Sequence, residues 1–110
     1  MNEGDEPVPG QGIPGELGPE SRLRRVPGIA WRVVEEEAIL VNVRRDEVIH
    51  LDPVGSFIWS RMDGRAPLEE IAKALVEEFE VDLETAVDDI LDFAGRLLRQ
   101  GAAEVVELET

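Results

Sequence analysis

The feature that most constrains the fold of this chain is the helical spacing of apolar residues after Pro67. Apolar side chains recur three and four positions apart, at Leu68, Ile71, Ala72, Leu75, Val76 and Phe79. This spacing places them on one face of an α-helix, with charged residues on the other. We therefore predict an amphipathic helix that begins at Pro67.

A second long helix is predicted from Leu83 to about Gln100. Asp82 stands where an N-terminal cap is expected, and Gly101 follows the last helical residue, where glycine commonly ends a helix. The apolar residues of this helix are Ala86, Val87, Ile90, Leu91, Phe93, Ala94, Leu97 and Leu98. They cover a wider face than one core contact requires, so contacts on more than one side are predicted.

A shorter helix is predicted upstream, from Pro53 to about Met62. Asp52 can accept hydrogen bonds from the free backbone N–H groups of the first turn, and Pro53 fits that turn without losing a needed donor. The apolar residues Val54, Phe57 and Ile58 have helical spacing, and Asp63-Gly64 is predicted to end the helix.

The segment from Ile29 to Leu51 contains short runs of β-forming residues separated by charged turns. Three strands are predicted, at 30–34, 38–43 and 47–51, with connections short enough for hairpins. Residues 102–106 either form a further strand or fray. Three strands and three helices predict an α+β fold of the winged helix-turn-helix type, in which a small three-stranded antiparallel sheet accompanies a three-helix bundle.

A chain of 110 residues is long enough for one domain with a single core. Residues 1–20 hold five glycines, four prolines, five acidic residues and no base, a composition that buries too little apolar surface to become ordered. We predict that residues 1–25 form a disordered acidic tail and a basic linker, and that residues 26–110 form the domain. The basic patch at 21–25 is interpreted as a solvated linker, with a docking arm for an acidic partner as the alternative.

The charge of the chain restricts its partners. The formal net charge is -14, and residues 66–94 hold ten Asp or Glu and a single base, Lys73. Such a chain is repelled by nucleic acid and by anionic membranes, although the predicted fold commonly places its last helix on DNA. A peptide with Lys or Arg would be attracted, and a merely solvated helix face is the alternative reading.

The location is predicted from what the sequence lacks. It has no cysteine, no apolar run of the length that spans a membrane and no basic, apolar start of the kind that forms a signal peptide. We therefore expect a protein of the cytoplasm that does not bind membranes.

No residues are typical of a catalytic or metal site. His50 is the only histidine, and Ser21, Ser56 and Ser60 have no neighbouring base. We therefore expect no enzyme activity, no cofactor and no metal. The predicted fold instead favours a binding function. The exposed edge of a short sheet beside a wide apolar helix face can accept an extended peptide as an added strand.

Two stretches of the chain resemble the PqqD family, whose members are also called RiPP recognition elements. The stretches are VIHLDPVGSFIWSRMDG at 48–64 and LEEIAKALVEEFEVDLETAVDDILDFAGRLLRQG at 68–101. The resemblance covers roughly residues 26–107. It rests on the Leu-Asp entry with Ile58-Trp59 and Asp63-Gly64, on the Glu70-Ile71 helix, and on the V-D-D-I-L-D-F helix that ends in Leu-x-x-x-Gly.

The resemblance implies a peptide chaperone that performs no chemistry. It binds the leader segment of a ribosomally made precursor peptide and delivers it to a modifying enzyme, often a radical SAM protein. In the family, the leader adds as a strand along the last strand of the small sheet and rests against the last helix. Carried onto this sequence, the peptide-binding residues are Glu47, Val48, Ile49, His50, Leu51, Leu91, Asp92, Gly95, Leu98 and Arg99.

The sequence departs from the family members of pyrroloquinoline quinone biosynthesis. Their second strand ends in a Pro-Glu-Arg-like segment, whereas this chain has Val43-Arg44-Arg45-Asp46, and the acidic tail is not a family feature. We therefore expect an element of another peptide-modification cluster, with the quinone pathway as the narrower alternative. A protein-docking or homodimerisation domain and a DNA-binding regulator are the alternatives from other functional classes.

Overall fold

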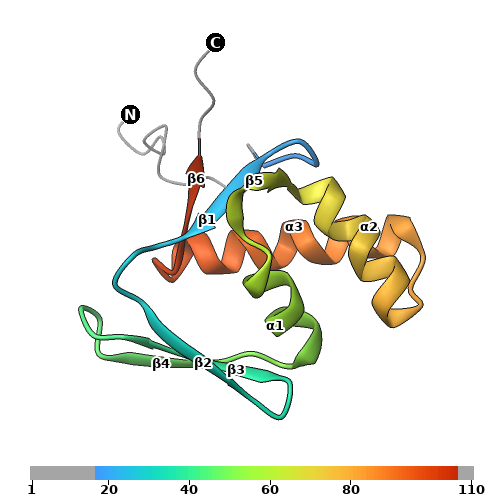
Figure 1. The fold of residues 1–110 in the computed structure, drawn as a ribbon. Helices are drawn as coiled ribbons and strands as arrows, with labels where there is room; N and C mark the ends of the chain where they lie inside the picture. The colour runs from blue at the N-terminus through green and yellow to red at the C-terminus, as the bar shows by residue number, and fades with distance from the viewer. Residues whose placement is uncertain (1–16, 107–110) are drawn as a thin grey trace, which may run out of the picture.

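The structure is a computed structural model that describes residues 17–106, in which three helices and six strands are present (Figure 1). Their bounds are β1 Arg22–Arg25, β2 Ala30–Val34, β3 Glu37–Asn42, β4 Glu47–His50, α1 Pro53–Ser60, β5 Asp63–Pro67, α2 Leu68–Phe79, α3 Leu83–Arg99 and β6 Ala103–Val106. The strands form two antiparallel sheets, β5-β1-β6 and β2-β3-β4. The predicted α+β class is confirmed, and the β5-β1-β6 sheet is an addition to it.

The β2-β3-β4 sheet confirms the three strands predicted before α1. Its register pairs Arg32 with Ile39 and Ile39 with His50. The connection between β2 and β3 is one residue shorter than predicted and consists of Glu35 and Glu36, which have φ angles of 52° and 71°. Two successive residues with positive φ form the tight turn that suits a two-residue hairpin, here without the usual Asn-Gly sequence.

The β5-β1-β6 sheet corrects the interpretation of residues 21–25 as a solvated linker. Arg22–Arg25 forms β1, the middle strand of this sheet, and Leu23 is only 1% exposed. The packed part of the chain therefore begins before the boundary predicted at residue 26. Residues 1–16, which the sequence predicts to be disordered, lie outside the described residues.

The segment after α1 also differs from the prediction. The helix ends at Ser60, and Asp63-Gly64 starts β5 instead of ending the helix. The Asp63 carboxylate accepts hydrogen bonds from the backbone N–H groups of Arg65 (2.9 Å) and Ala66 (3.2 Å). These hydrogen bonds favour the charged form, so they hold the pKa of Asp63 below its usual value.

The helices α2 and α3 confirm the two long periodic patterns and pack against each other around the core (Figure 1). The apolar face of α3 is as wide as predicted, since Ala86, Ile90, Phe93, Ala94 and Leu97 are buried and Val87, Leu91 and Leu98 are partly buried. Asp82 occupies the N-terminal cap of α3, but its side chain makes no capping hydrogen bond.

Ser56 joins α1 to the sheet that carries β4. Its Oγ accepts a hydrogen bond from the backbone N–H of Ala38 (2.6 Å) and donates one to the carbonyl of Leu51 (3.2 Å). Because the side chain is buried, Ser56→Ala would leave the N–H of Ala38 without this partner. We expect the free energy of unfolding to fall by about 1–3 kcal/mol, measured by urea unfolding.

Ser60→Ala is the matched control for this prediction. Its hydroxyl is exposed and donates only to the carbonyl of Phe57, one turn earlier in the same helix. We expect this variant to be nearly as stable as the wild type. Equal losses in the two variants would contradict the role assigned to Ser56.

Candidate binding groove

β4 is an outer strand of its sheet, and in the part of the chain that the structure describes no strand pairs with its other side. The backbone N–H of Leu51 donates to the carbonyl of Ala38 at the start of β3 (2.9 Å). Ladder bonds alternate along an antiparallel strand, so Ile49, like Leu51, directs its backbone groups toward β3. Val48 and His50 direct theirs toward the open edge, where an added strand can pair.

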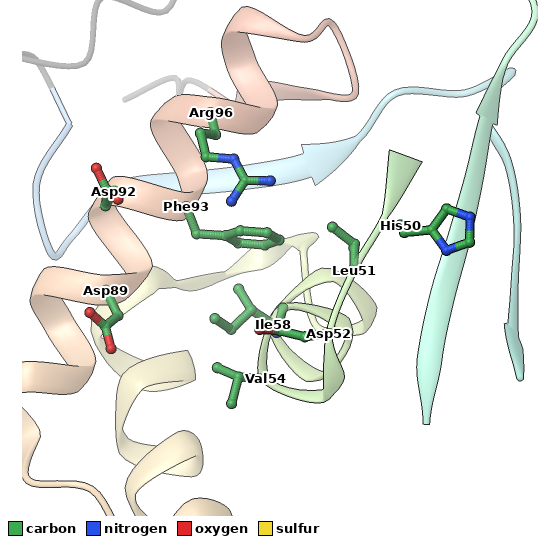
Figure 2. Close-up of a pocket in the computed structure, with 10 residues that line it drawn as sticks. His50, Leu51, Asp52, Val54, Ile58, Asp89, Asp92, Phe93 and Arg96 are labelled. Atoms are coloured by element: carbon green, nitrogen blue, oxygen red, sulfur yellow. The ribbon is translucent and has the colours of Figure 1, made fainter. Parts of the chain in front are cut away.

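The side chains along β4 and at Leu51 alternate between the two faces of the sheet, as in any strand. Ile49 and Leu51 are buried, whereas Val48 is 61% exposed and His50 is exposed on the same face. Figure 2 shows His50 pointing away from α3. The strand therefore presents its backbone edge on one side, and the side chains of Ile49 and Leu51 are buried beneath the sheet.

An open groove of about 390 Å³ lies between the end of β4, the first turns of α1 and the middle of α3 (Figure 2). Its lining residues are His50, Leu51, Asp52, Val54, Gly55, Ile58, Asp89, Asp92, Phe93 and Arg96. The groove thus brings together β4 and the last helix, the two elements that the sequence predicts to hold a peptide.

Phe93 forms the apolar floor of the groove. Its ring projects from α3 toward Leu51 and α1 (Figure 2) and is 8% exposed. A Cβ atom at Gly55 would lie 3.2 Å from Cε1 of Phe93, so glycine allows the first turn of α1 to approach the ring closely. That turn is held by the predicted cap, in which Asp52 accepts a hydrogen bond from the backbone N–H of Gly55 (2.8 Å).

The rim of the groove carries more negative than positive charge. It has three carboxylates and one guanidinium, from Asp52, Asp89, Asp92 and Arg96. The guanidinium carbon of Arg96 lies 5.7 Å from the centroid of the Phe93 ring, a distance typical of a cation–π contact. Within residues 17–106 none of these rim side chains takes part in an ion pair. The rim therefore favours a cationic ligand.

Several of the predicted site residues lie at this groove. His50, Leu51 and Asp92 line it, and residues 47–49 lead into it along β4. Residues 47–51 and Asp92 are far apart in the sequence. They meet at one groove only because α3 packs against α1 and the sheet. The structure thus places His50, Leu51 and Asp92 around the same groove, and their contact with a peptide stays a prediction.

The other predicted residues of α3 lie elsewhere on the helix. Leu91 and Leu98 are partly buried and pack against the core, and Gly95 is buried. Arg99 is exposed at the end of α3, where its carbonyl accepts a hydrogen bond from the Arg45 side chain (3.1 Å). None of these α3 residues lines the groove.

Three residues of α3 that line the groove were not predicted as site residues, namely Asp89, Phe93 and Arg96. Together with Asp92 they follow the spacing i, i+3, i+4 and i+7, which marks one face of a helix. The sequence therefore contained a signal. It was not decisive, because the wide apolar face of α3 has several such stripes, and only its packing against α1 decides which one meets the groove.

The described residues contain neither a cluster that could hold a metal ion nor a helix that could cross a membrane. Within residues 17–106 no three His, Cys, Asp or Glu side chains are placed to hold a metal ion. In the same segment no helix combines the length and the apolar character needed to cross a membrane. The groove itself combines a main-chain edge, an apolar floor and a charged rim, which are the features that bind an extended peptide.

A family model described as coenzyme PQQ synthesis protein D (PqqD) matches residues 37–102 of the chain. A search of curated protein sequences found no match. Among solved structures, the chain is similar to TbiB1 in complex with the TbiA(beta) leader peptide, with 28% identity and a TM-score of 0.68. That similarity covers 74% of this chain and 94% of TbiB1.

Two further solved structures share the fold. Lasso peptide synthetase B1 complexed with the leader peptide is 24% identical, with a TM-score of 0.67 and coverage of 74% of this chain and 96% of that one. The PqqD truncation of Methylobacterium extorquens PqqCD, described as a functional and stand-alone RiPP recognition element, is 22% identical. Its TM-score is 0.70, with coverage of 83% of this chain and 97% of that one.

Proposed function

Since this chain belongs to the PqqD family, we propose that it is a recognition element that binds the leader segment of a ribosomally synthesised precursor peptide. It presents the peptide to a separate modifying enzyme. The leader adds as a strand along β4 and rests in the groove against α3. Main-chain hydrogen bonds supply affinity, and the groove supplies selectivity.

The observation that carries this proposal is the open edge of β4 beside a groove with an apolar floor. Val48 and His50 direct their backbone groups outward at this edge, and Phe93 lies on the floor of the adjoining groove. TbiB1, which has the same fold, was solved with a leader peptide, as was lasso peptide synthetase B1. These structures support the same class of ligand for this chain.

The proposed contacts cover both walls of the site. On β4 they involve residues 47–51, and on α3 they begin with Asp92 and the neighbouring groove residues. The remaining predicted residues are Leu91, Gly95, Leu98 and Arg99. They contact the leader only if it continues past the groove to the other side of α3.

The chemistry of the pathway is assigned to the partner enzyme, for which a radical SAM protein is the proposed class. The Ser56 hydroxyl is already hydrogen-bonded to two backbone groups, and His50 is the only histidine. We propose a modification other than quinone synthesis, because Val43-Arg44-Arg45-Asp46 replaces the segment expected for that pathway. The site of action proposed for the chain is the cytoplasm.

Fluorescence anisotropy tests the proposed function. The full chain is titrated into labelled leader segments of the precursor peptides encoded beside its gene, each paired with a scrambled peptide of the same composition. We expect saturable binding of one leader, with a Kd of micromolar order or lower, and at least about tenfold weaker binding of its scrambled form. Equal binding of both forms, or no binding of any leader, would contradict the proposal.

Homodimerisation through the outer face of the β2-β3-β4 sheet is a second candidate function. Val41 and Val48 face each other across β3 and β4, and they are 36% and 61% exposed. Apolar side chains that are exposed side by side can form an interface between copies. Sedimentation velocity separates the two functions, since a stable dimer that a leader does not alter would favour the second.

A further inference from the structure

The α3 wall of the groove carries two carboxylates, Asp89 and Asp92, which lie three positions apart on one helix face. Both side chains are exposed, and Figure 2 shows both on the helix that carries Phe93. The remaining groove carboxylate, Asp52, already accepts the capping hydrogen bond from Gly55. Asp89 and Asp92 are therefore the carboxylates best placed to meet a ligand.

Arg96 does not neutralise this pair. It stands one turn after Asp92, but its guanidinium lies against the Phe93 ring, with 5.7 Å between the guanidinium carbon and the ring centroid. Within residues 17–106 neither aspartate forms an ion pair. The groove thus places two uncompensated negative charges beside an apolar floor.

The charge around the groove has the same sign. Residues 66–94, which include α2 and most of α3, hold ten acidic residues and the single base Lys73. A field of this sign speeds the association of cationic ligands and opposes anionic ones. The two carboxylates do not lie on an isolated surface. The opposite wall of the groove is the end of β4, whose open backbone edge can pair with a peptide strand.

Building on the proposed function, we propose that the groove selects a leader segment in which a Lys or Arg accompanies an apolar side chain. The apolar side chain packs on Phe93 between Val54 and Ile58 while the leader backbone pairs with β4. The cationic side chain extends to Asp89 and Asp92. An acidic residue at the same place is excluded by repulsion from both carboxylates.

Selection from an mRNA-displayed library of random twelve-residue peptides tests this proposal with three full-length baits. The baits are the wild type, Asp89→Asn/Asp92→Asn and Glu77→Gln/Glu78→Gln. Glu77 and Glu78 are exposed on α2 and do not line the groove, so the last bait matches the change in net charge. We expect peptides selected with the wild type and with the Glu77/Glu78 variant to share a Lys or Arg at a fixed position beside an apolar residue. Peptides selected with Asp89→Asn/Asp92→Asn should lack this preference.

The best selected peptide then gives the size of the effect. Replacing its basic residue by Gln should weaken binding to the wild type by about threefold to tenfold, and binding to Asp89→Asn/Asp92→Asn by less than about twofold. The same Lys or Arg preference with all three baits would overturn the proposal, because the preference would then come from the overall charge.

Binding of the selected peptides to a fourth bait, Val48→Pro, separates this proposal from the proposed function. Peptides without a basic preference that fail to bind a Val48→Pro bait would overturn the charge preference and leave peptide binding at β4 intact. If no selected peptide depends on Val48, both the proposed function and the inference are contradicted.

Discussion

Replacing Val48 by proline is expected to weaken leader binding by at least about tenfold while the domain stays folded. The backbone N–H of Val48 points to the open edge of β4, so the sheet itself loses no hydrogen bond. Proline removes this donor, and its ring occupies the space that an added strand needs. Isothermal titration calorimetry measures the affinity for the leader, and circular dichroism monitors the fold.

Two variants make this result specific. Val33→Pro places the same ring on the opposite edge of the same sheet, where the alternation of the β2-β3 ladder leaves the N–H of Val33 pointing outward. Val48→Ala keeps the backbone donor and removes only side-chain contacts. We expect both to bind the leader within about threefold of the wild type. A Val33→Pro variant that binds as weakly as Val48→Pro would contradict pairing at β4.

Leu23→Ala is expected to lower the free energy of unfolding by about 2–5 kcal/mol. Leu23 is 1% exposed and lies in the middle strand of the β5-β1-β6 sheet, so the shorter side chain leaves a cavity in the core. The effect is large for a residue inside a segment of arginines that the sequence predicts to be a linker. Urea unfolding followed by circular dichroism measures it.

Arg24→Ala is the control on the same strand. The Arg24 side chain is 55% exposed and pairs with Glu104 at the surface, so we expect a loss of at most about 1 kcal/mol. If Leu23→Ala were no more destabilising than Arg24→Ala, the segment would behave as a linker, and the assignment of β1 to the core would be wrong.

Local sequence patterns correctly predict the elements whose main contacts are with residues nearby in the sequence. The helical spacing from Leu68 to Phe79 and the hairpin pattern before α1 each have one dominant solution, and the structure has both. β1 could not be predicted this way. Leu23 is the only buried residue of β1. The residues that pair with Arg22 in this strand, Pro67 and Val106, are distant in the sequence. Only the complete fold makes Arg22–Arg25 a central strand.

The groove was predictable in part for a related reason. The period of two along a strand places Ile49 and Val48 on opposite faces, and the family resemblance implies that the last helix lies beside this strand. Phe93 shows where prediction stops. As one of many apolar residues on α3, it becomes the groove floor only because Gly55 lets α1 approach its ring. That contact depends on the packing angle between α1 and α3, which the residues of either helix alone do not determine.

The most direct test of leader binding along β4 is amide hydrogen exchange measured by NMR on the ¹⁵N-labelled chain, with and without the leader segment. In the free protein the amides of Val48 and His50 face the open edge, whereas that of Leu51 is bonded to Ala38. We predict that the leader slows exchange at Val48 and His50 by about tenfold or more and shifts the resonances of Asp89, Asp92 and Phe93. Unchanged exchange at both amides under leader saturation would contradict strand addition at β4, and with it the central claim.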